Sequence, residues 1–316
     1  MGRGGIVLEK IPVILDTDIG GDIDDTWGLA LLLSRPELDL KLITISSTSP
    51  RFSAKVAAKF CECVNRGDVP IGIGFRSLTN SGRSEDKIKK HQRDWVEDYD
   101  IAAYPGKISY DAVGEMIETI RKSDSPITLI AIGPASNLAE AINRAPDIAD
   151  KVRVKALFGS IYRGYDGPPC AEYNVWADIP AAKRFMEGFD DITLSPLDTC
   201  FDIPNSKEQF AKLLEAENDN PLVKALVENC RVWCKNHPRW EGKPCDNWDY
   251  ICDTVAVYLA YSEELVNIET LPVSVNKDGK TPIDRENGKN VRLALSWKDN
   301  DMFVEHVIRS LLDFKG

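Results

Sequence analysis

The sequence is poor in histidine, in basic residues relative to acidic ones, and in long apolar runs. It contains three histidines among 316 residues, and its 39 Lys and Arg face 50 Asp and Glu, which gives a formal net charge of -11. A protein that binds nucleic acid neutralises phosphates with clustered Lys and Arg, so this balance argues against a nucleic-acid partner. No run of about 18 apolar residues is present, which argues against a membrane partner.

Signals that would export, divide or cross-link the chain are also missing. The residues before Asp16 contain no apolar stretch long enough for the core of a signal peptide, so we expect a cytoplasmic location. The eight cysteines lack paired CxxC spacing, which argues against zinc and favours reduced thiols. Without a Gly-, Pro- or Ser-rich linker or an internal repeat, we expect one domain over residues 1–316. The polar residues 80–100 are expected to form a surface excursion or lid.

Short apolar segments alternate with helical ones along the chain. The segments with the pattern of buried strands are 11–16, 40–47, 126–133, 152–159 and 191–198. The segments with a helical pattern are 24–35, 136–144 with Ser136 as a candidate cap, 180–188 and 252–261. This alternation predicts an α/β fold, with a mostly parallel central sheet and helices on both faces, Rossmann-like in type. Ligands bind at the carboxyl ends of the strands in such sheets.

An acidic cluster lies directly after the first expected strand. The segment DTDIGGDIDD, residues 16–25, holds five aspartates and two glycines. Two unit charges about 4 Å apart repel by roughly 4 kcal/mol at an effective dielectric constant near 20, so a bound cation would relieve the cluster. Coordination by several carboxylates favours Ca²⁺, with Mg²⁺ second because it requires a stricter octahedron.

The residues around this cluster resemble a known family. ILDTDIGGDIDDTWGLALLL (14–33) resembles the amino-terminal signature of the inosine-uridine-preferring nucleoside hydrolase family, a strand followed by DxDxGxDD and an apolar helix, with two extra residues after Gly20. Four later blocks are similar to family blocks in the same order: PITLIAIGPASNLAEAINRAPDIADKV (126–152), AEYNVWADIPAAKRF (171–185), LSPLDT (194–199) and CDTVAVYLAY (252–261). The resemblance covers most of residues 11–261 and implies the nucleoside hydrolase fold.

The resemblance implies a calcium site and a catalytic base. Asp18, Asp25 and Asp253 match family carboxylates that bind Ca²⁺, and Ile132 matches a residue whose main-chain carbonyl also binds the ion. In the family the metal holds a water and two ribose hydroxyls, and the aspartate corresponding to Asp18 takes the proton of that water. The implied reaction is hydrolysis of the N-glycosidic bond of a ribonucleoside to ribose and free base, through an oxocarbenium-like transition state.

Further positions match residues that hold the sugar. Asp24, Glu172 and Asn174 match residues that hydrogen-bond the ribose, Asp253 belongs to this set as well, and Asp166 stands where an Asn often reaches the outer hydroxyl. The implied partner is a small nucleoside or ribosyl analogue, and the implied assembly is a homodimer or homotetramer.

The sequence departs from the family on the side of the leaving base. Cys252 stands where many members have a His proposed to protonate the base, and Ser49-Pro50 stands where the family has Gly-Asn. The family's Pro- and His-containing segment after the third strand has no convincing counterpart here. The candidates for the base side are Cys252, Trp248, Trp240, Trp95 and His91.

Two other functions stay open at this point. One is a metal- and ribose-binding protein that has lost catalysis, an interpretation that Cys252 and Pro50 encourage. The other is a Mg²⁺-dependent phosphohydrolase of the haloacid dehalogenase type, which also begins with a strand and DxD. That class expects Thr or Val two residues after the second Asp, where this chain has Gly20.

Overall fold

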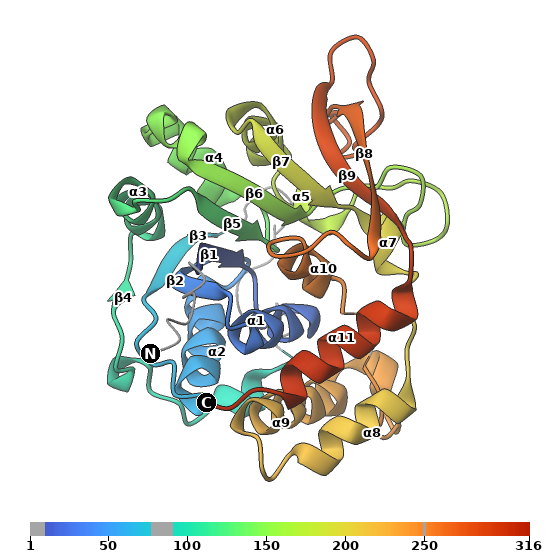
Figure 1. Cartoon of the computed structure of the whole chain (residues 1–316). Helices are drawn as coiled ribbons and strands as arrows, with labels where there is room; N and C mark the ends of the chain where they lie inside the picture. The colour runs from blue at the N-terminus through green and yellow to red at the C-terminus, as the bar shows by residue number, and fades with distance from the viewer. Residues whose placement is uncertain (1–9, 77–90, 249–250) are drawn as a thin grey trace, which may run out of the picture.

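A nine-stranded sheet forms the centre of the computed structural model, which describes residues 10–76, 91–248 and 251–316 (Figure 1). In spatial order the strands are β4 (Ile108–Ser109), β3 (Ile71–Arg76), β2 (Leu38–Ser47), β1 (Ile11–Thr17), β5 (Ile127–Ala131), β6 (Val152–Leu157), β7 (Asp191–Ser195), β9 (Lys289–Trp297) and β8 (Val266–Val273). Neighbouring strands are parallel except for β8, which pairs antiparallel with β9. The expected mostly parallel α/β sheet is confirmed.

Helices cover both faces of the sheet (Figure 1). They are α1 (Asp24–Ser34), α2 (Pro50–Cys63), α3 (Ala112–Lys122), α4 (Ser136–Arg144), α5 (Tyr173–Ala177), α6 (Ile179–Gly188), α7 (Leu197–Cys200), α8 (Lys207–Ala216), α9 (Pro221–Asn236), α10 (Asp253–Tyr258) and α11 (Asn300–Leu312). Short 3₁₀ helices are η2 (Arg93–Val96), η3 (Ile101–Ala103), η4 (Pro146–Lys151) and η5 (Pro238–Trp240).

The two faces follow from the alternation of side chains along each strand. In β1, Val13 and Leu15 pack with residues of α1, α2, α9, α10 and α11, whereas Ile14 packs with residues of α3, α4 and α6. A strand buried on both faces is apolar at every position, which is why the segment before Asp16 has no alternating pattern.

Some details differ from the expectations. Ser136 does not cap α4, because Ala135 holds the N-cap position and the Ser136 hydroxyl donates to Asp178 Oδ2 at 2.7 Å. The β8–β9 pair was not expected from the sequence. Of the expected excursion over 80–100, residues 80–90 lie outside the described residues, and the remainder contains η2 with Trp95 buried.

The order of the strands creates a switch point between β1 and β5. From β1 the chain builds β2, β3 and β4 on one side, and then it returns to build β5, β6 and β7 on the other. The connections therefore leave β1 and β5 in opposite directions, and a crevice opens beyond their carboxyl ends. Asp18 follows β1 and Ile132 follows β5, so both lie at this point.

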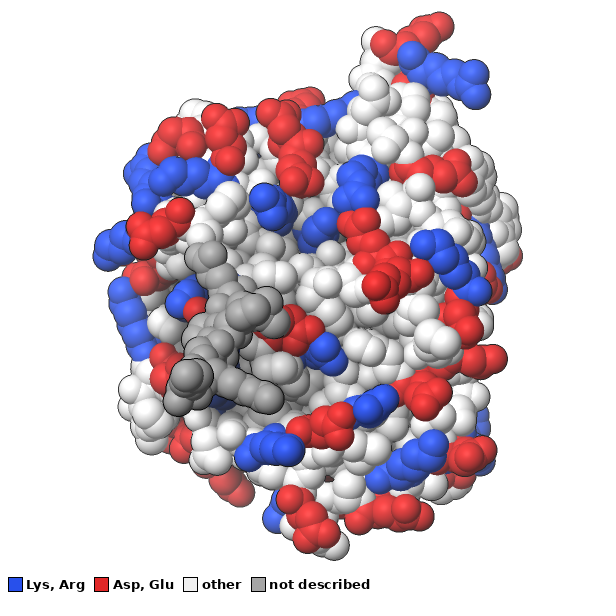
Figure 2. All heavy atoms as spheres, viewed as in Figure 1, with Lys and Arg blue, Asp and Glu red and all other residues white. Residues whose placement is uncertain are grey.

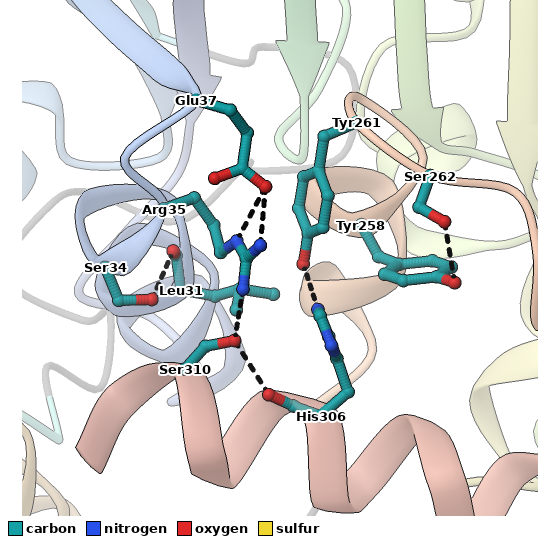
Figure 3. Close-up of polar contacts among 9 residues, drawn as sticks. All are labelled: Leu31, Ser34, Arg35, Glu37, Tyr258, Tyr261, Ser262, His306 and Ser310. Atoms are coloured by element: carbon teal, nitrogen blue, oxygen red, sulfur yellow. Dashed lines mark hydrogen bonds and ion pairs between the residues drawn. The ribbon is translucent and has the colours of Figure 1, made fainter. Parts of the chain in front are cut away.

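Polar contacts attach α11 to the rest of the fold (Figure 3). Arg35, directly after α1, pairs with Glu37 through Nε at 3.0 Å and donates to Ser310 Oγ on α11 at 2.8 Å. Its guanidinium carbon lies 4.7 Å from the centre of the Tyr261 ring, and Tyr261 Oη lies 2.9 Å from His306 Nε2. We call Arg35, Glu37, Tyr261, His306 and Ser310 the α11 anchor; its one carboxylate faces its one guanidinium.

The surface carries charges of both signs. Figure 2 shows Lys and Arg side chains interspersed with Asp and Glu over the visible face, without a concentrated basic patch there. No helix within the described ranges is long and apolar enough to cross a membrane.

Candidate active site

A cavity of about 340 Å³ lies beyond the carboxyl ends of β1 and β5. Arg239 is the one basic residue among the described residues that line it. Six of the lining residues are acidic: Asp18, Asp22, Asp24, Asp25, Glu172 and Asp253. The cavity therefore carries a strong excess of negative charge, as the sequence predicts for this edge of the sheet.

The turn after β1 delivers the first acidic residues. Gly20 has a φ of +102°, a conformation that L side chains rarely adopt, so a glycine is required there for the chain to leave β1 and enter α1. Helix α1 then begins at Asp24 and Asp25, whose carboxylates lie in its first turn, where the partial positive charge of the helix end favours them. Asp25 is buried, and Asp24 is partly buried.

Close packing of α1 against α10 brings in Asp253, which opens α10. A Cβ on Gly28 would lie 3.3 Å from Asp253 Cβ and 3.2 Å from Ile132 Cδ1, so this position of α1 has little room for a side chain. As a result, one carboxylate oxygen each from Asp24, Asp25 and Asp253 lies within 4.8 Å of the other two. Residues more than 220 positions apart in sequence thus form one set of oxygen donors.

The electrostatics of the cluster favour a cation. Burial, and after it the charges of neighbouring carboxylates, raise the pKa of Asp18, Asp24, Asp25 and Asp253 well above the usual value. A raised pKa means that the charged forms are costly together without a cation. Proton uptake or a divalent cation would relieve this cost, and an all-oxygen donor set suits a hard cation.

Hydroxyl and amide groups behind the cavity hold the first strand and the cluster in place. The Thr17 hydroxyl donates to Asp25 Oδ1. Asp16 is fully buried and accepts at Oδ2 from Thr44 Oγ1 at 2.6 Å and from Asn137 Nδ2 at 2.8 Å. Burial raises the pKa of Asp16 to about 7 against these hydrogen bonds. Asp16 therefore links β1, β2 and α4 and does not line the cavity.

Glu172 and Asn174 also line the cavity, and hydrogen bonds restrain their side chains. The Glu172 carboxylate caps α5, accepting from the backbone N–H groups of Asn174 at 2.7 Å, Val175 at 3.2 Å and Gly159 at 3.1 Å. Burial nevertheless raises the pKa of Glu172 to about 7. Asn174 Nδ2 donates to the Ile132 carbonyl oxygen at 3.2 Å, which leaves that oxygen a second lone pair.

The structure brings most, but not all, of the predicted site residues to the cavity. Its lining includes every predicted metal-binding residue and the predicted Asp24, Glu172, Asn174 and Cys252. Asp166 differs from its expected placement, because it is exposed and lies outside the lining. Ser49 and Pro50 also lie outside the lining, where Pro50 begins α2.

The aromatic candidates for the base side pack elsewhere. Trp248 is buried against the ring of Trp27, with ring centroids 5.7 Å apart, and Trp95 packs against Phe60. Trp240 packs against Trp233, and His91 Nδ1 lies 3.0 Å from the carbonyl oxygen of Asn236. None of these four residues lies in the described lining of the cavity: Trp95, Trp240, Trp248 and His91.

Four residues at the rim of the cavity were not expected from the sequence. Tyr165, Tyr173, Phe201 and Arg239 all line the cavity. Tyr173 lies between the predicted Glu172 and Asn174, so its place in the sequence was a signal for it. Its backbone N–H donates to Tyr165 Oη at 3.1 Å. Arg239 had no such signal, because η5 reaches the cavity through the fold alone.

Comparison with known proteins identifies the family. Residues 13–305 match the sequence profile of the inosine-uridine preferring nucleoside hydrolase family. The chain is 31% identical over 195 residues to the pyrimidine-specific ribonucleoside hydrolase RihA of Enterobacter sp. (strain 638), and the match spans 60% of each chain. It is 26% identical over 306 residues to uridine nucleosidase 1 of Arabidopsis thaliana, a match that covers 92% of this chain and 88% of that protein.

Solved structures share the fold. The plant nucleoside hydrolase PpNRh1 superposes with a TM-score of 0.78 at 23% identity, covering 96% of this chain and 99% of that one. An inosine-uridine preferring nucleoside hydrolase from Bacillus anthracis gives a TM-score of 0.76 at 18% identity, with coverage of 96% and 99%. The resemblance seen in the sequence motifs is confirmed, and this chain belongs to the inosine-uridine preferring nucleoside hydrolase family.

Proposed function

We propose that the protein hydrolyses the N-glycosidic bond of a ribonucleoside to ribose and free base. The observation that carries this proposal is the set of carboxylates at the switch point, where Asp18 lies beside the oxygen cluster of Asp24, Asp25 and Asp253. The names of the relatives, a pyrimidine-specific ribonucleoside hydrolase and a uridine nucleosidase, support a nucleoside as substrate. The match to this family speaks against the phosphohydrolase alternative.

We further propose Ca²⁺ as the resident ion. Its ligands would be carboxylate oxygens of Asp18, Asp25 and Asp253 and the carbonyl oxygen of Ile132, a donor set made only of oxygen. When bound, Ca²⁺ would offset the carboxylate charges and supply an anchoring point for water and ribose hydroxyls. The raised pKa values of these carboxylates fit such a site, since they indicate charges that the described protein groups leave uncompensated.

The side chains of the cavity then have distinct roles. Asp18, at the end of β1, takes the proton of the attacking water as general base. Asp24, Glu172, Asn174 and Asp253 hold the ribose hydroxyls, and the carboxylates among them stabilise positive charge that develops on the sugar. A 2′-deoxy substrate would leave one of these buried groups unpaired, at a cost of about 1 to 3 kcal/mol.

Cys252 supports a second candidate, a ribose-binding protein without catalysis. A hydrogen bond with Cys200, followed by burial, raises the pKa of the Cys252 thiol well above its usual value. A thiol that holds its proton so firmly is a poor general acid for a departing base. Hydrolysis without that acid requires a nucleobase that departs readily without being protonated. A protein that only binds the nucleoside requires no acid.

Ribose release from purified protein separates these candidates. The protein is incubated with Ca²⁺ and with uridine, cytidine, inosine, adenosine or guanosine, and free ribose is measured. We expect release from at least one nucleoside, abolished by Asp18→Ala and by chelation of the metal. Calorimetric binding of nucleoside without release in the wild type would favour the binding protein and overturn hydrolysis.

The proposal also covers the compartment and the oligomeric state of the protein. We infer a cytoplasmic enzyme of nucleoside salvage that works as a homodimer or homotetramer, which the family resemblance suggests. Light scattering after gel filtration measures the assembly, and a monomer at micromolar concentration would contradict it.

A further inference from the structure

A pair of cysteines lies outside the machinery described above. Cys234 belongs to the last turns of α9, and Cys245 follows η5 in the chain. Neither cysteine forms a disulfide in the structure, and their sulfur atoms lie 2.9 Å apart. A disulfide bond is about 2.0 Å long, so the two sulfurs need to move only slightly to become bonded.

The pair opens onto a second cavity of about 500 Å³ with a basic character. Arg231, Lys235 and Lys243 line it together with the two cysteines, against one acidic lining residue, Glu241. Arg231 is paired with Glu217 and Lys235 with Asp94, and Lys243 is exposed. In a chain of net charge -11, such a surface around a dithiol suits a small anionic reagent.

The segment between the two cysteines also reaches the acidic cavity. In η5, Arg239 lines the acidic cavity while the next residue, Trp240, lines the basic one. A covalent bond between Cys234 and Cys245 would close a short loop that contains η5. Closing a loop removes conformational freedom from the residues within it, and here these residues include the one basic group of the described cavity lining.

We propose that Cys234 and Cys245 form a reversible disulfide on reaction with a small anionic disulfide of the glutathione type, and that this bond fixes η5 at the mouth of the acidic cavity. The Cys245 thiolate attacks one sulfur of glutathione disulfide, forms a mixed disulfide and releases one glutathione thiolate. The Cys234 thiolate then attacks the Cys245 sulfur, forms the internal bond and releases the second glutathione. The protein loses two protons and two electrons, and one glutathione disulfide becomes two glutathione thiols.

The surroundings of the pair favour this order of attack. Cys245 is partly exposed, whereas Cys234 is buried. The hydrogen bond from Cys234 lowers the pKa of the Cys245 thiol, which increases the fraction of thiolate near neutral pH. Cys230, one turn earlier on α9, is buried, and burial raises its pKa well above the usual value. It therefore serves as a matched control on the same helix.

The experiment uses the reduced full-length protein, incubated with glutathione disulfide and analysed by intact mass and peptide mapping. We expect the wild type and Cys230→Ser to lose two hydrogens, with a peptide that links Cys234 to Cys245, and dithiothreitol to reverse the change. Cys234→Ser should stop at one glutathione adduct on Cys245. Failure of the native wild type to form the linked peptide, while the same cysteines react in denatured protein, would overturn the proposal.

A second measurement tests the effect on η5. Trypsin cleavage after Arg239 should be several-fold slower in the oxidised wild type than in the reduced one, and oxidant should not slow it in Cys245→Ser. Equal cleavage rates for oxidised and reduced wild type would overturn the effect on η5. Neither readout depends on nucleoside hydrolysis, so their outcome is independent of the proposed activity.

Discussion

The charged residues at the two ends of α1 differ in whether a group of opposite charge lies beside them. At its start, Asp24 and Asp25 join Asp253 in a cavity with six acidic residues and one basic one in the described lining. Just past its end, Arg35 is matched by Glu37 and covered by Tyr261 in the α11 anchor. Helix α10 also runs from the cavity to the anchor, since it begins with Asp253 at the cavity and is followed by Tyr261 at the anchor.

This difference suggests that the cavity end of α1 serves ligand binding and that the anchor end serves stability. In the α11 anchor the matched charges of Arg35 and Glu37 satisfy each other inside the chain, so we expect them to stabilise the fold. Unmatched buried carboxylates raise one another's pKa and weaken the fold until a ligand compensates them. We therefore expect substitutions at the cavity to change function more than stability and substitutions at the anchor to do the reverse.

Asp18→Asn should have the largest effect. Loss of the proposed general base should lower kcat for ribose release by about 10² to 10⁴-fold, measured with the best nucleoside substrate. The melting temperature without added metal should stay the same or rise, because one unmatched charge is removed. A variant that keeps wild-type kcat would rule out Asp18 as the base.

Asp253→Asn should remove the stabilisation that the proposed Ca²⁺ ion would provide. At a free Ca²⁺ concentration about 100 times the dissociation constant, the ion should add about 2.7 kcal/mol to the free energy of unfolding of the wild type. Urea unfolding with and without Ca²⁺ measures this gain, which should largely vanish in the variant. An equal gain in both proteins would place the ion elsewhere.

Arg35→Met should show the opposite behaviour at the other end of α1. It leaves Glu37 without its guanidinium and removes the donor to Ser310, so the free energy of unfolding should fall by about 1 to 2 kcal/mol. Urea unfolding measures this loss, and kcat should remain within about twofold of the wild type. Adding Glu37→Gln to the Arg35→Met variant should lower the free energy of unfolding little further, because the ion pair is already broken.

His306 should produce the smallest effect, a pH dependence of stability. Burial, followed by the positive charge of Arg35, lowers the pKa of His306 below its usual value. The charge of Arg309 also lowers this pKa, and the charge of Glu37 raises it by a smaller amount. The unfolded chain then binds the proton more readily than the folded one. The contribution of His306 to stability is present above about pH 6.5 and is lost as pH falls through the folded pKa.

The matched variant for this prediction is His306→Gln, which keeps a polar group near Tyr261 but does not titrate. Urea unfolding between pH 7.5 and pH 5 should show a shallower fall in stability for the variant than for the wild type. Parallel curves would show that another group dominates in this range.

The sequence predicted the parts of the molecule that depend on local pattern. Continuous apolar strands and the spacing of Asp18, Asp24 and Asp25 were sufficient to place the acidic turn at the carboxyl end of β1. Asp253 was reached through the family resemblance, because nothing local reveals that α10 packs beside α1. The β8–β9 pair was missed, since its strands are only partly buried and lack the continuous apolar run of the parallel strands.

The rim could not be predicted for a physical reason. Asp166 matched by order in the chain, yet its loop turns it to the solvent, while its neighbour Tyr165 lines the cavity. Arg239 lies on a short 3₁₀ helix that is packed against α9 through the rings of Trp240 and Trp233. Loop residues such as these take their place from tertiary packing, which a pattern of apolar and polar residues does not encode.

Gly28 allows α1 and α10 to pack closely beside the acidic cavity. A single methyl group at this position would press on both Asp253 and Ile132 and increase the separation of α1 and α10 by a few tenths of an ångström. At the proposed metal site, the fit of divalent ions of different radius would then depend partly on a residue that donates no atom to any of them.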